Sequence, residues 1–301
     1  MVKTYRVYQV DSFTKTRFCG NPAGVVPNAD GLSESQMQRI ARELNNSETA
    51  FIFKSNSPEY DVEVRFFTPT TEVPLCGHAT IAAHYIRALE NEIISGRVIQ
   101  KTKASILPVD IICESNDISI VMTQGEPFVG EDLGENLRLK IAEGLNIKVN
   151  DICEEFPVAI ASTGHSKVMI PLRSIQTLNS LNPNEALLTQ MSEEIECNGF
   201  YTFTLSPNED VLVHGRMFAP AIGISEDPVT GNANGPLGAY LVHYGIHQKE
   251  TEDTFDFKII QGEAIGRAGT MNVHVAKENR KPILVQITGS AIVAFQTEIV
   301  L

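Results

Sequence analysis

The feature that most constrains the fold of this chain is a phrase of sequence that occurs twice. Residues 65–79 read RFFTPTTEVPLCGHA, and residues 216–233 read RMFAPAIGISEDPVTGNA. The arginines that open the two copies are 151 residues apart, which is about half of the 301-residue chain. Each copy is typical of a strand that ends at a proline, a loop, and a helix that begins with small residues. The repeat predicts two homologous halves that build one site between them.

The helices that follow the two copies indicate how each half is built. Residues 78–88 and 231–242 are apolar on nearly every side, which is typical of a helix enclosed by other elements. We therefore predict an α+β fold of two pseudo-symmetric halves, each a mostly antiparallel strand layer wrapped around a central helix. The first half comprises residues 1–124 and 286–301, and the second comprises residues 125–285.

Local signals place further elements. Ser33 and Gln36 form a capping-box pair, and apolar residues follow at helical spacing until Asn45 ends the helix. Pro183 stands where a helix of the second half would begin, because proline is common at the first helical position. Residues 283–295 are interpreted as one plain strand.

The composition disfavours several classes of partner. A net charge of −13 would repel nucleic acid and an anionic membrane, and no segment is apolar for long enough to span a bilayer. Five cysteines without a C-x-x-C pair disfavour a disulfide framework or a zinc site. We expect a cytoplasmic protein with no metal and no cofactor, and a homodimer is compatible with this expectation.

Three polar residues of the first half are candidates for chemistry. Glu48 stands among apolar strand residues, so it is either an edge carboxylate facing water or a general base in an apolar cleft. His78 lies in the first turn of the enclosed helix, where it either hydrogen-bonds the loop or holds a substrate. Cys76 precedes this helix, and a thiol at a helix start can be nucleophilic, although buried cysteines are usually inert.

The second half offers different polar groups at the matching places. Asp227 precedes a proline, which is also a common turn device, and Asn232 stands where the first half has a histidine. Gly77 and Gly231 begin the two helices. Small residues there leave backbone N–H groups facing outward, which is a geometry that binds anions. We therefore expect a small anionic substrate.

Several motifs together resemble the PhzF family, which is named after the phenazine-biosynthesis isomerase. They are Gly20-Asn21-Pro22-Ala23-Gly24, Asn46-Ser47-Glu48-Thr49-Ala50, Leu75-Cys76-Gly77-His78-Ala79, Glu226-Asp227-Pro228-Val229-Thr230-Gly231, Gln261-Gly262 and Gly289-Ser290-Ala291. The resemblance covers the whole chain. It implies the diaminopimelate-epimerase-like fold, in which the active site lies in the cleft between two pseudo-symmetric halves.

The resemblance also implies roles for single residues. In the phenazine isomerase a glutamate moves a proton within a dihydro-hydroxyanthranilate ring without a cofactor, and Glu48 matches this glutamate. The substrate-holding histidine and aspartate match His78 and Asp227. Asn232 stands where that enzyme has a serine, which disfavours the same substrate because an amide cannot share a proton as a hydroxyl does. Racemases of the same fold use two thiols. Cys76 matches one of them and Thr230 replaces the other, which disfavours their mechanism.

Three hypotheses for the function remain open. The leading one is a cofactor-independent isomerase in which Glu48 moves a proton within a small carboxylate-bearing substrate. The second is an epimerase or racemase that uses Glu48 and one other group, for which Cys76 is a candidate. The third is a protein that binds small molecules or partners without turnover.

Overall fold

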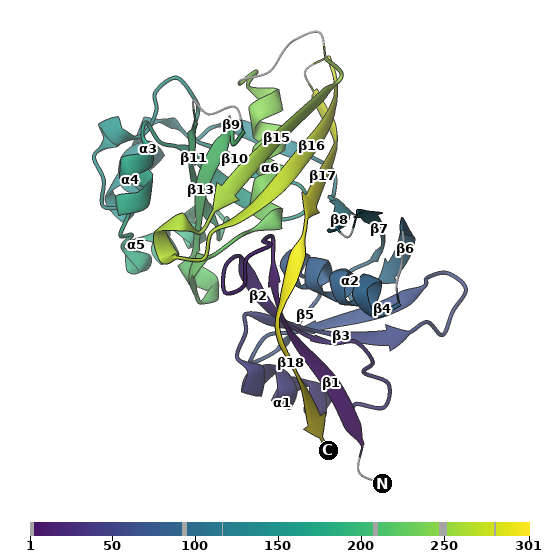
Figure 1. Cartoon of the computed structure of the whole chain (residues 1–301). Helices are drawn as coiled ribbons and strands as arrows, with labels where there is room; N and C mark the ends of the chain where they lie inside the picture. Colours follow the sequence, from purple (N-terminus) through teal and green to yellow (C-terminus); the bar gives the residue numbers. More distant parts are fainter. Residues whose placement is uncertain (1–2, 92–94, 116, 207–209, 247–251, 280) are drawn as a thin grey trace. The chain divides into compact units, whose positions relative to one another are not determined.

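The computed structural model describes residues 3–91, 95–115, 117–206, 210–246, 252–279 and 281–301. The chain divides into two compact units (Figure 1). Unit 1 comprises Met1–Thr123 and Thr288–Leu301, and unit 2 comprises Gln124–Ile287. Among the described residues, no helix combines the length and the apolar character that crossing a bilayer requires.

Unit 1 contains two helices among its described residues, and most of its remaining elements are strands. Its elements are β1 (Thr4–Ser12), β2 (Asn21–Val26), α1 (Glu34–Leu44), β3 (Glu48–Lys54), β4 (Val62–Phe67), β5 (Glu72–Val73), α2 (Gly77–Asn91), β6 (Ser95–Lys101), β7 (Ile106–Glu114), β8 (Asp117–Thr123) and β18 (Ala291–Val300).

Unit 2 begins with a strand and a helix of its own and then repeats the order of unit 1. Its elements are β9 (Phe128–Asp132), α3 (Gly134–Gly144), η1 (Val149–Asp151), β10 (Ala159–Ser162), β11 (Ser166–Pro171), α4 (Ile175–Ser180), α5 (Glu185–Glu194), β12 (Phe200–Leu205), β13 (Val213–Ala219), η2 (Pro220–Ile222), β14 (Ile224–Asp227), α6 (Gly231–His243), β15 (Thr254–Gln261), η3 (Glu263–Ile265), β16 (Gly269–Glu278) and β17 (Lys281–Gly289).

The strand pairings of the two units match one by one. In unit 1, β2 pairs in parallel with β3, β3 pairs antiparallel with β4, and β4 pairs in parallel with β6. In unit 2, β11, β12, β13 and β15 pair in the same order and the same directions. The short strands β5 and β14 each pair antiparallel with the strand that precedes them. The predicted α+β fold with a duplicated topology is therefore confirmed.

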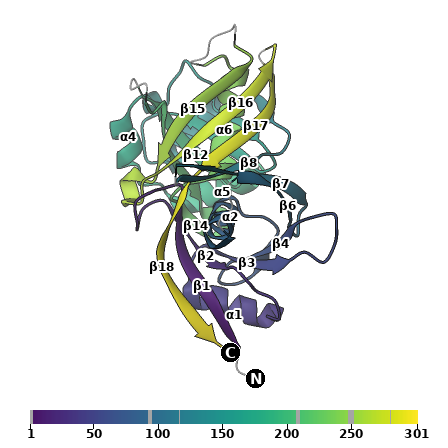
Figure 2. The same cartoon turned by 45° about the vertical axis from the view of Figure 1, so that its right-hand side comes forward.

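Each unit encloses a central helix, as the apolar sequence predicts. Helix α2 packs against β1, β2, β3, β7, β8 and β18, and Figure 2 shows strands of unit 1 on several sides of it. Helix α6 packs against β9, β10, β11 and β16. Gly238 permits the approach to β16, since a Cβ atom there would lie 2.8 Å from Cγ atoms of both Val273 and Val275. The two sequence copies therefore lead into equivalent buried helices.

The repeat extends to an ion pair that joins the last two strands before each central helix. The guanidinium of Arg65 in β4 donates to both carboxylate oxygens of Glu72 at 2.7 and 2.9 Å. The guanidinium of Arg216 in β13 donates to both oxygens of Glu226 at 2.9 and 2.7 Å. Such paired, parallel hydrogen bonds fix geometry as well as charge. We infer that each pair holds its strand hairpin in place ahead of the helix start.

The local signals for helix ends were partly right. The capping box is confirmed: the Ser33 side chain accepts from the Gln36 N–H, and the Gln36 side chain accepts from the Ser33 N–H. The helix start predicted at Pro183 was wrong by two residues. Helix α5 begins at Glu185 because the Asn184 side chain caps it by accepting from the Leu187 N–H at 3.2 Å.

The single strand predicted over residues 283–295 was also wrong. The chain forms β17 up to Gly289 and then β18 from Ala291, which pairs with β1. At the break, the Phe13 N–H donates to the carbonyl of Ser290 at 2.7 Å. A Cβ atom at Gly289 would lie 2.5 Å from the Phe13 ring, so the close passage requires glycine at this position. The chain therefore forms two strands here, and the second of them, β18, takes β1 as its partner.

The buried His84 on α2 predicts a pH dependence of stability. Its ring donates from Nε2 to Gln100 Oε1 at 2.7 Å and accepts at Nδ1 from Arg87, and burial lowers the pKa of His84 to about 3. The unfolded chain, with an ordinary pKa near 6.5, binds a proton that the folded chain does not bind. Hence the free energy of unfolding should fall by about 1.4 kcal/mol per pH unit from pH 6.5 toward 3.

Two measurements check the contribution of His84 to the pH dependence of stability. NMR of the folded protein should show the His84 ring neutral at pH 5, and urea unfolding at pH 7 and pH 5 should show a smaller loss of stability in His84→Gln than in the parent. A ring that titrates near 6.5 in the folded state would contradict the prediction.

Candidate functional site

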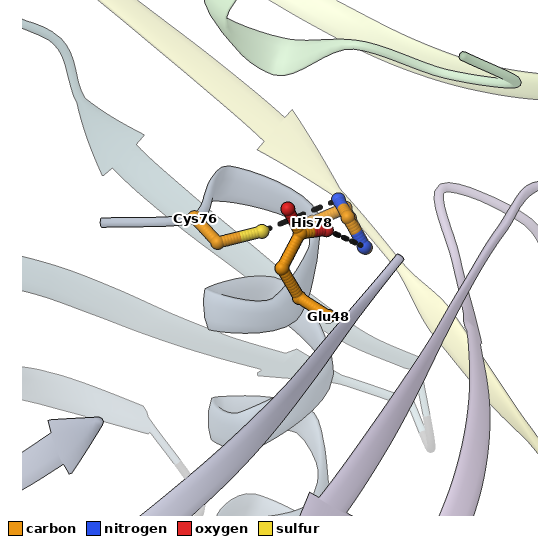
Figure 3. Close-up of side chains that lie close together, drawn as sticks. All are labelled: Glu48, Cys76 and His78. Carbon is orange, nitrogen blue, oxygen red and sulfur yellow. Dashed lines mark hydrogen bonds and ion pairs between the residues drawn. The ribbon is translucent and has the colours of Figure 1, made fainter. Parts of the chain in front are cut away.

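Three of the predicted residues meet in unit 1. His78 Nε2 lies 3.4 Å from Glu48 Oε2, and His78 Nδ1 lies 3.4 Å from the sulfur of Cys76 (Figure 3). The hydroxyl of Ser47 lies 3.3 Å from the same Nε2 atom. The side chain of Glu48 is 16% exposed, and that of His78 is 8% exposed. The site is therefore a small, largely desolvated cluster of ionisable groups.

Local structure brings these residues together from two elements. Asn45, in the left-handed conformation with φ 53°, ends α1 and turns the chain toward β3, whose first residue is Glu48. Helix α2 begins at Gly77, which places His78 in its first turn. The Ser12 hydroxyl donates to the carbonyl of His78 at 2.8 Å and thereby ties this turn to β1. A strand start and a helix start thus face each other within one unit.

The first turn of α2 is suited to receive a negative charge. The first backbone N–H groups of a helix have no acceptor within the helix, and the helix dipole adds a positive potential. A Cβ atom added at Gly77 would meet nothing within 4 Å, so the volume on that side of the helix start is open.

The same three side chains could be considered as ligands of a metal ion, because one ligand atom from each lies within 4.8 Å of the others. The contacts argue against a single shared ion. Glu48 faces Nε2 of the His78 ring, whereas Cys76 faces Nδ1. A metal ion binds only one of these two nitrogens, which point away from each other on the ring. The arrangement is better suited to passing a proton between Glu48 and His78.

In unit 2 the predicted aspartate is held at the start of α6. Asp227 ends β14, and its carboxylate accepts a hydrogen bond from the hydroxyl of Thr230, the residue before the helix. The side-chain amide of Gln261 donates to the Asp227 carbonyl at 2.8 Å and to the Thr230 hydroxyl at 3.1 Å. Its oxygen accepts from the Thr230 N–H at 3.2 Å. These contacts fix the orientation of the Asp227 carboxylate.

Buried amide and hydroxyl groups extend this network. Asn234 donates to the Gln261 oxygen at 2.9 Å, and Tyr201 donates to Asn234 at 2.5 Å. Tyr201, Asn234 and Gln261 have no solvent exposure. Thr230 is therefore part of a structural network around the helix start.

The candidates fall into two groups, one in each unit. Unit 1 holds Glu48, Cys76, Gly77 and His78 together, and Asp227, Asn232 and Gly231 lie at the start of α6 in unit 2, where Asn232 is half-buried. Sequence reasoning gave no role to Ser47 or Gln261. Both stand inside motifs that carry the family resemblance, so their position in those motifs was the available signal.

Comparison with known proteins decides the family. A model described as PhzC-PhzF, phenazine biosynthesis-like protein, matches residues 10–297. The chain belongs to this family. An uncharacterized isomerase of Clostridium acetobutylicum is 56% identical over 302 residues and covers all of both chains. The trans-2,3-dihydro-3-hydroxyanthranilate isomerase of Pseudomonas chlororaphis is 29% identical over 97% of this chain and 98% of its own.

Solved structures of family members have the same fold. The phenazine biosynthesis protein of the PhzF family from Bacillus anthracis superposes with a TM-score of 0.89 at 32% identity, over 99% of this chain and all of the other. A hydroxyproline epimerase from Agrobacterium vitis superposes with a TM-score of 0.64 at 14% identity, over 99% and 93% of the two chains. The second likeness shows the fold alone. The predicted PhzF resemblance and the epimerase-like fold are confirmed.

Proposed function

We propose that this PhzF-family chain is an isomerase that moves a proton within a small carboxylate-bearing substrate without a cofactor. The observation that carries the proposal is the contact between Glu48 and His78 at the start of α2. The family's members include proteins named isomerases, and among them is one that acts on trans-2,3-dihydro-3-hydroxyanthranilate. A largely buried carboxylate beside a histidine is a suitable acid–base pair for such chemistry.

In the proposed reaction, Glu48 removes a proton from a carbon that a neighbouring carboxylate or enol makes acidic. The electron pair released from the C–H bond moves into the conjugated system, and Glu48 returns the proton to a different carbon. His78 hydrogen-bonds the substrate and lies 3.4 Å from Glu48, so it stabilises the charge that develops during transfer. No atom enters or leaves the substrate, and no oxidant is needed.

In unit 1, orientation of the substrate is assigned to His78 and to the N–H groups that begin at Gly77, which would hold a carboxylate. In unit 2, Asp227, Asn232 and the N–H groups that begin at Gly231 are the polar groups available to a ligand. Asn232 offers an amide where the phenazine isomerase has a hydroxyl. For this reason we propose a substrate that differs from dihydro-hydroxyanthranilate at the group that this residue contacts.

A solvent-exchange experiment tests the proposal. The protein is incubated in deuterium oxide with a panel of small unsaturated and hydroxylated carboxylates, after thermal-shift screening has selected those that stabilise it. An isomerase should introduce solvent deuterium into its substrate and shift a double bond. A carboxylate that stabilises the protein but acquires no deuterium, across the whole panel, would favour a protein that only binds its ligand.

The second candidate function is an epimerase in which Cys76 acts as the second proton carrier. The observation that favours it is the 3.4 Å contact between the Cys76 sulfur and His78 Nδ1. Thr230, however, provides no second thiol, and its hydroxyl is committed to Asp227. We therefore expect Cys76→Ser to keep most of the turnover, since Glu48 remains as the base. Steady-state kinetics on the identified substrate measure this, and complete loss of turnover in a folded variant would favour the epimerase.

A further inference from the structure

The strand registers identify the residue of unit 2 that corresponds to Glu48. Arg65 lies opposite Phe51 in unit 1, and Arg216 lies opposite Thr202 in unit 2. Three residues earlier in the chain are Glu48, the first residue of β3, and Gly199, which directly precedes β12. The catalytic candidate of unit 1 therefore has a glycine as its counterpart in unit 2.

The neighbouring strand supplies a side chain at this place. In unit 1, β2 sets Ala23 beside Glu48. In unit 2, the parallel pairing of β11 with β12 begins at Val168 and Phe200, so Lys167 and Gly199 are the residues directly before its first pair. A Cβ atom built on Gly199 would lie 2.3 Å from Cδ and 2.8 Å from Cε of Lys167. The stem of Lys167 thus crosses the space that a side chain at position 199 would need. Where unit 1 has a carboxylate, unit 2 has an ammonium group.

The environment of Lys167 is unusual for a lysine. Its exposed fraction is 6%, and among the described residues its only side-chain hydrogen bond runs from Nζ to the carbonyl of Ser166 at 3.0 Å. No ion pair of the described residues includes it. Burial lowers the pKa of Lys167, and the nearby Cys197 and Asp227 act in the opposite direction. A buried ammonium with unused donors costs stability, so its presence calls for a ligand that neutralises it.

We propose that Lys167 is a substrate-binding residue whose ammonium group binds the carboxylate of the substrate beside Asp227. The assignment rests on the proposed function for the class of substrate. The ammonium would form an ion pair with the carboxylate and would offset the negative charge of Asp227, which would otherwise repel an anionic ligand. Lys167 and the start of α6 would then hold one end of the substrate.

An open pocket adjoins the residues that precede Lys167 and Gly199, although neither Lys167 nor Asp227 lines it. Its volume is about 460 Å³, and its lining includes Gly164, His165 and Ser166 before Lys167 and Glu193, Glu196, Cys197 and Asn198 before Gly199. Ser166, whose carbonyl accepts from Nζ, is one of these lining residues. The pocket therefore adjoins the ends of both strands that position the ammonium.

A binding experiment with matched ligands tests the role of Lys167. The probe is anthranilate, a stable aromatic carboxylate, and its neutral analogue anthranilamide is the matched ligand. NMR titration should show that the parent protein binds anthranilate about tenfold or more tightly than anthranilamide. Lys167→Met should lose this preference, because the substitution should weaken the binding of anthranilate and leave the binding of anthranilamide unchanged. Lys148→Met, which removes an exposed charge from the same unit, should change neither affinity.

Thermal unfolding separates a binding role from a structural one. A methionine side chain can occupy the space beside Gly199 that the stem of Lys167 occupies, and it carries no charge. Lys167→Met should therefore unfold at the same temperature as the parent or at a higher one. A lower unfolding temperature with unchanged anthranilate affinity would show that Lys167 is structural and would overturn the proposal. A parent protein that fails to bind anthranilate, or binds both ligands equally, would overturn it as well.

The binding result and the proposed function can fail separately. Carboxylate binding that depends on Lys167, without deuterium incorporation into any carboxylate of the panel, would reject the isomerase and keep the assignment of Lys167. Deuterium incorporation that persists at the parent rate and with the parent KM in Lys167→Met would keep the isomerase and reject the assignment.

Discussion

Glu48→Gln should fold like the parent and bind the same carboxylates, yet its turnover should fall by about two to four powers of ten. Glutamine has nearly the shape of glutamate, so the 3.4 Å contact with His78 can persist while the ability to accept a proton is lost. Ligand affinity should be retained because His78 and the start of α2 are unchanged. Deuterium incorporation and steady-state kinetics on the identified substrate measure the loss, which should appear in kcat.

The matched control is Glu59→Gln, which removes an exposed carboxylate elsewhere in unit 1. It should turn over at the parent rate, which would show that the effect of Glu48→Gln does not come from net charge. If Glu48→Gln also turned over at the parent rate, Glu48 would be a structural carboxylate and the proposed isomerase mechanism would fail.

Arg216→Met should destabilise the protein by about 3–5 kcal/mol, because it breaks a buried ion pair by removing one partner. The side chains of Arg216 and Glu226 are 7% and 12% exposed. Arg216 also donates to the carbonyls of Leu178 and Leu181 at 2.9 and 3.0 Å. The variant would leave a carboxylate and two carbonyls without their donor. Urea unfolding followed by circular dichroism measures the change, since the chain has no tryptophan.

The sequence repeat provides the control. Arg65→Met removes the equivalent arginine of unit 1, whose side chain is 24% exposed. Its partner Glu72 keeps a second cation, because Lys103 lies 3.1 Å away. We therefore expect a clearly smaller loss of stability than in Arg216→Met. Equal losses in the two variants would contradict the view that the Arg216 pair is the more critical one because Arg216 is more buried and Glu226 has no second cation among the described residues.

The sequence alone determined much of the architecture. The two copies of the motif predicted a duplicated fold with two enclosed helices, and the registers of both units confirm it. This worked because each motif joins strong local signals, namely a strand that ends at proline and small residues at a helix start. The capping box of Ser33 and Gln36 was predictable for the same reason, since all of its hydrogen bonds lie within four residues.

Tertiary structure decided what local signals could not. Residues 283–295 alternate like a single strand, but Gly289 has to pass against the Phe13 ring, and Phe13 is far away in the sequence. The chain then changes its partner strand. Such contacts depend on packing between distant segments, for which a pattern of alternating residues contains no information.

The candidate site shows the same division. Motifs identified Glu48, Cys76 and His78 one by one, but only the packing of β3 against the start of α2 places His78 between the other two. Lys167 has no sequence signal of its own. Its importance follows from its contact with Gly199 directly before the first pair of a parallel strand pairing, and such pairings join residues that are distant along the chain. The sequence determined which groups are present, and long-range strand register decided which of them face each other.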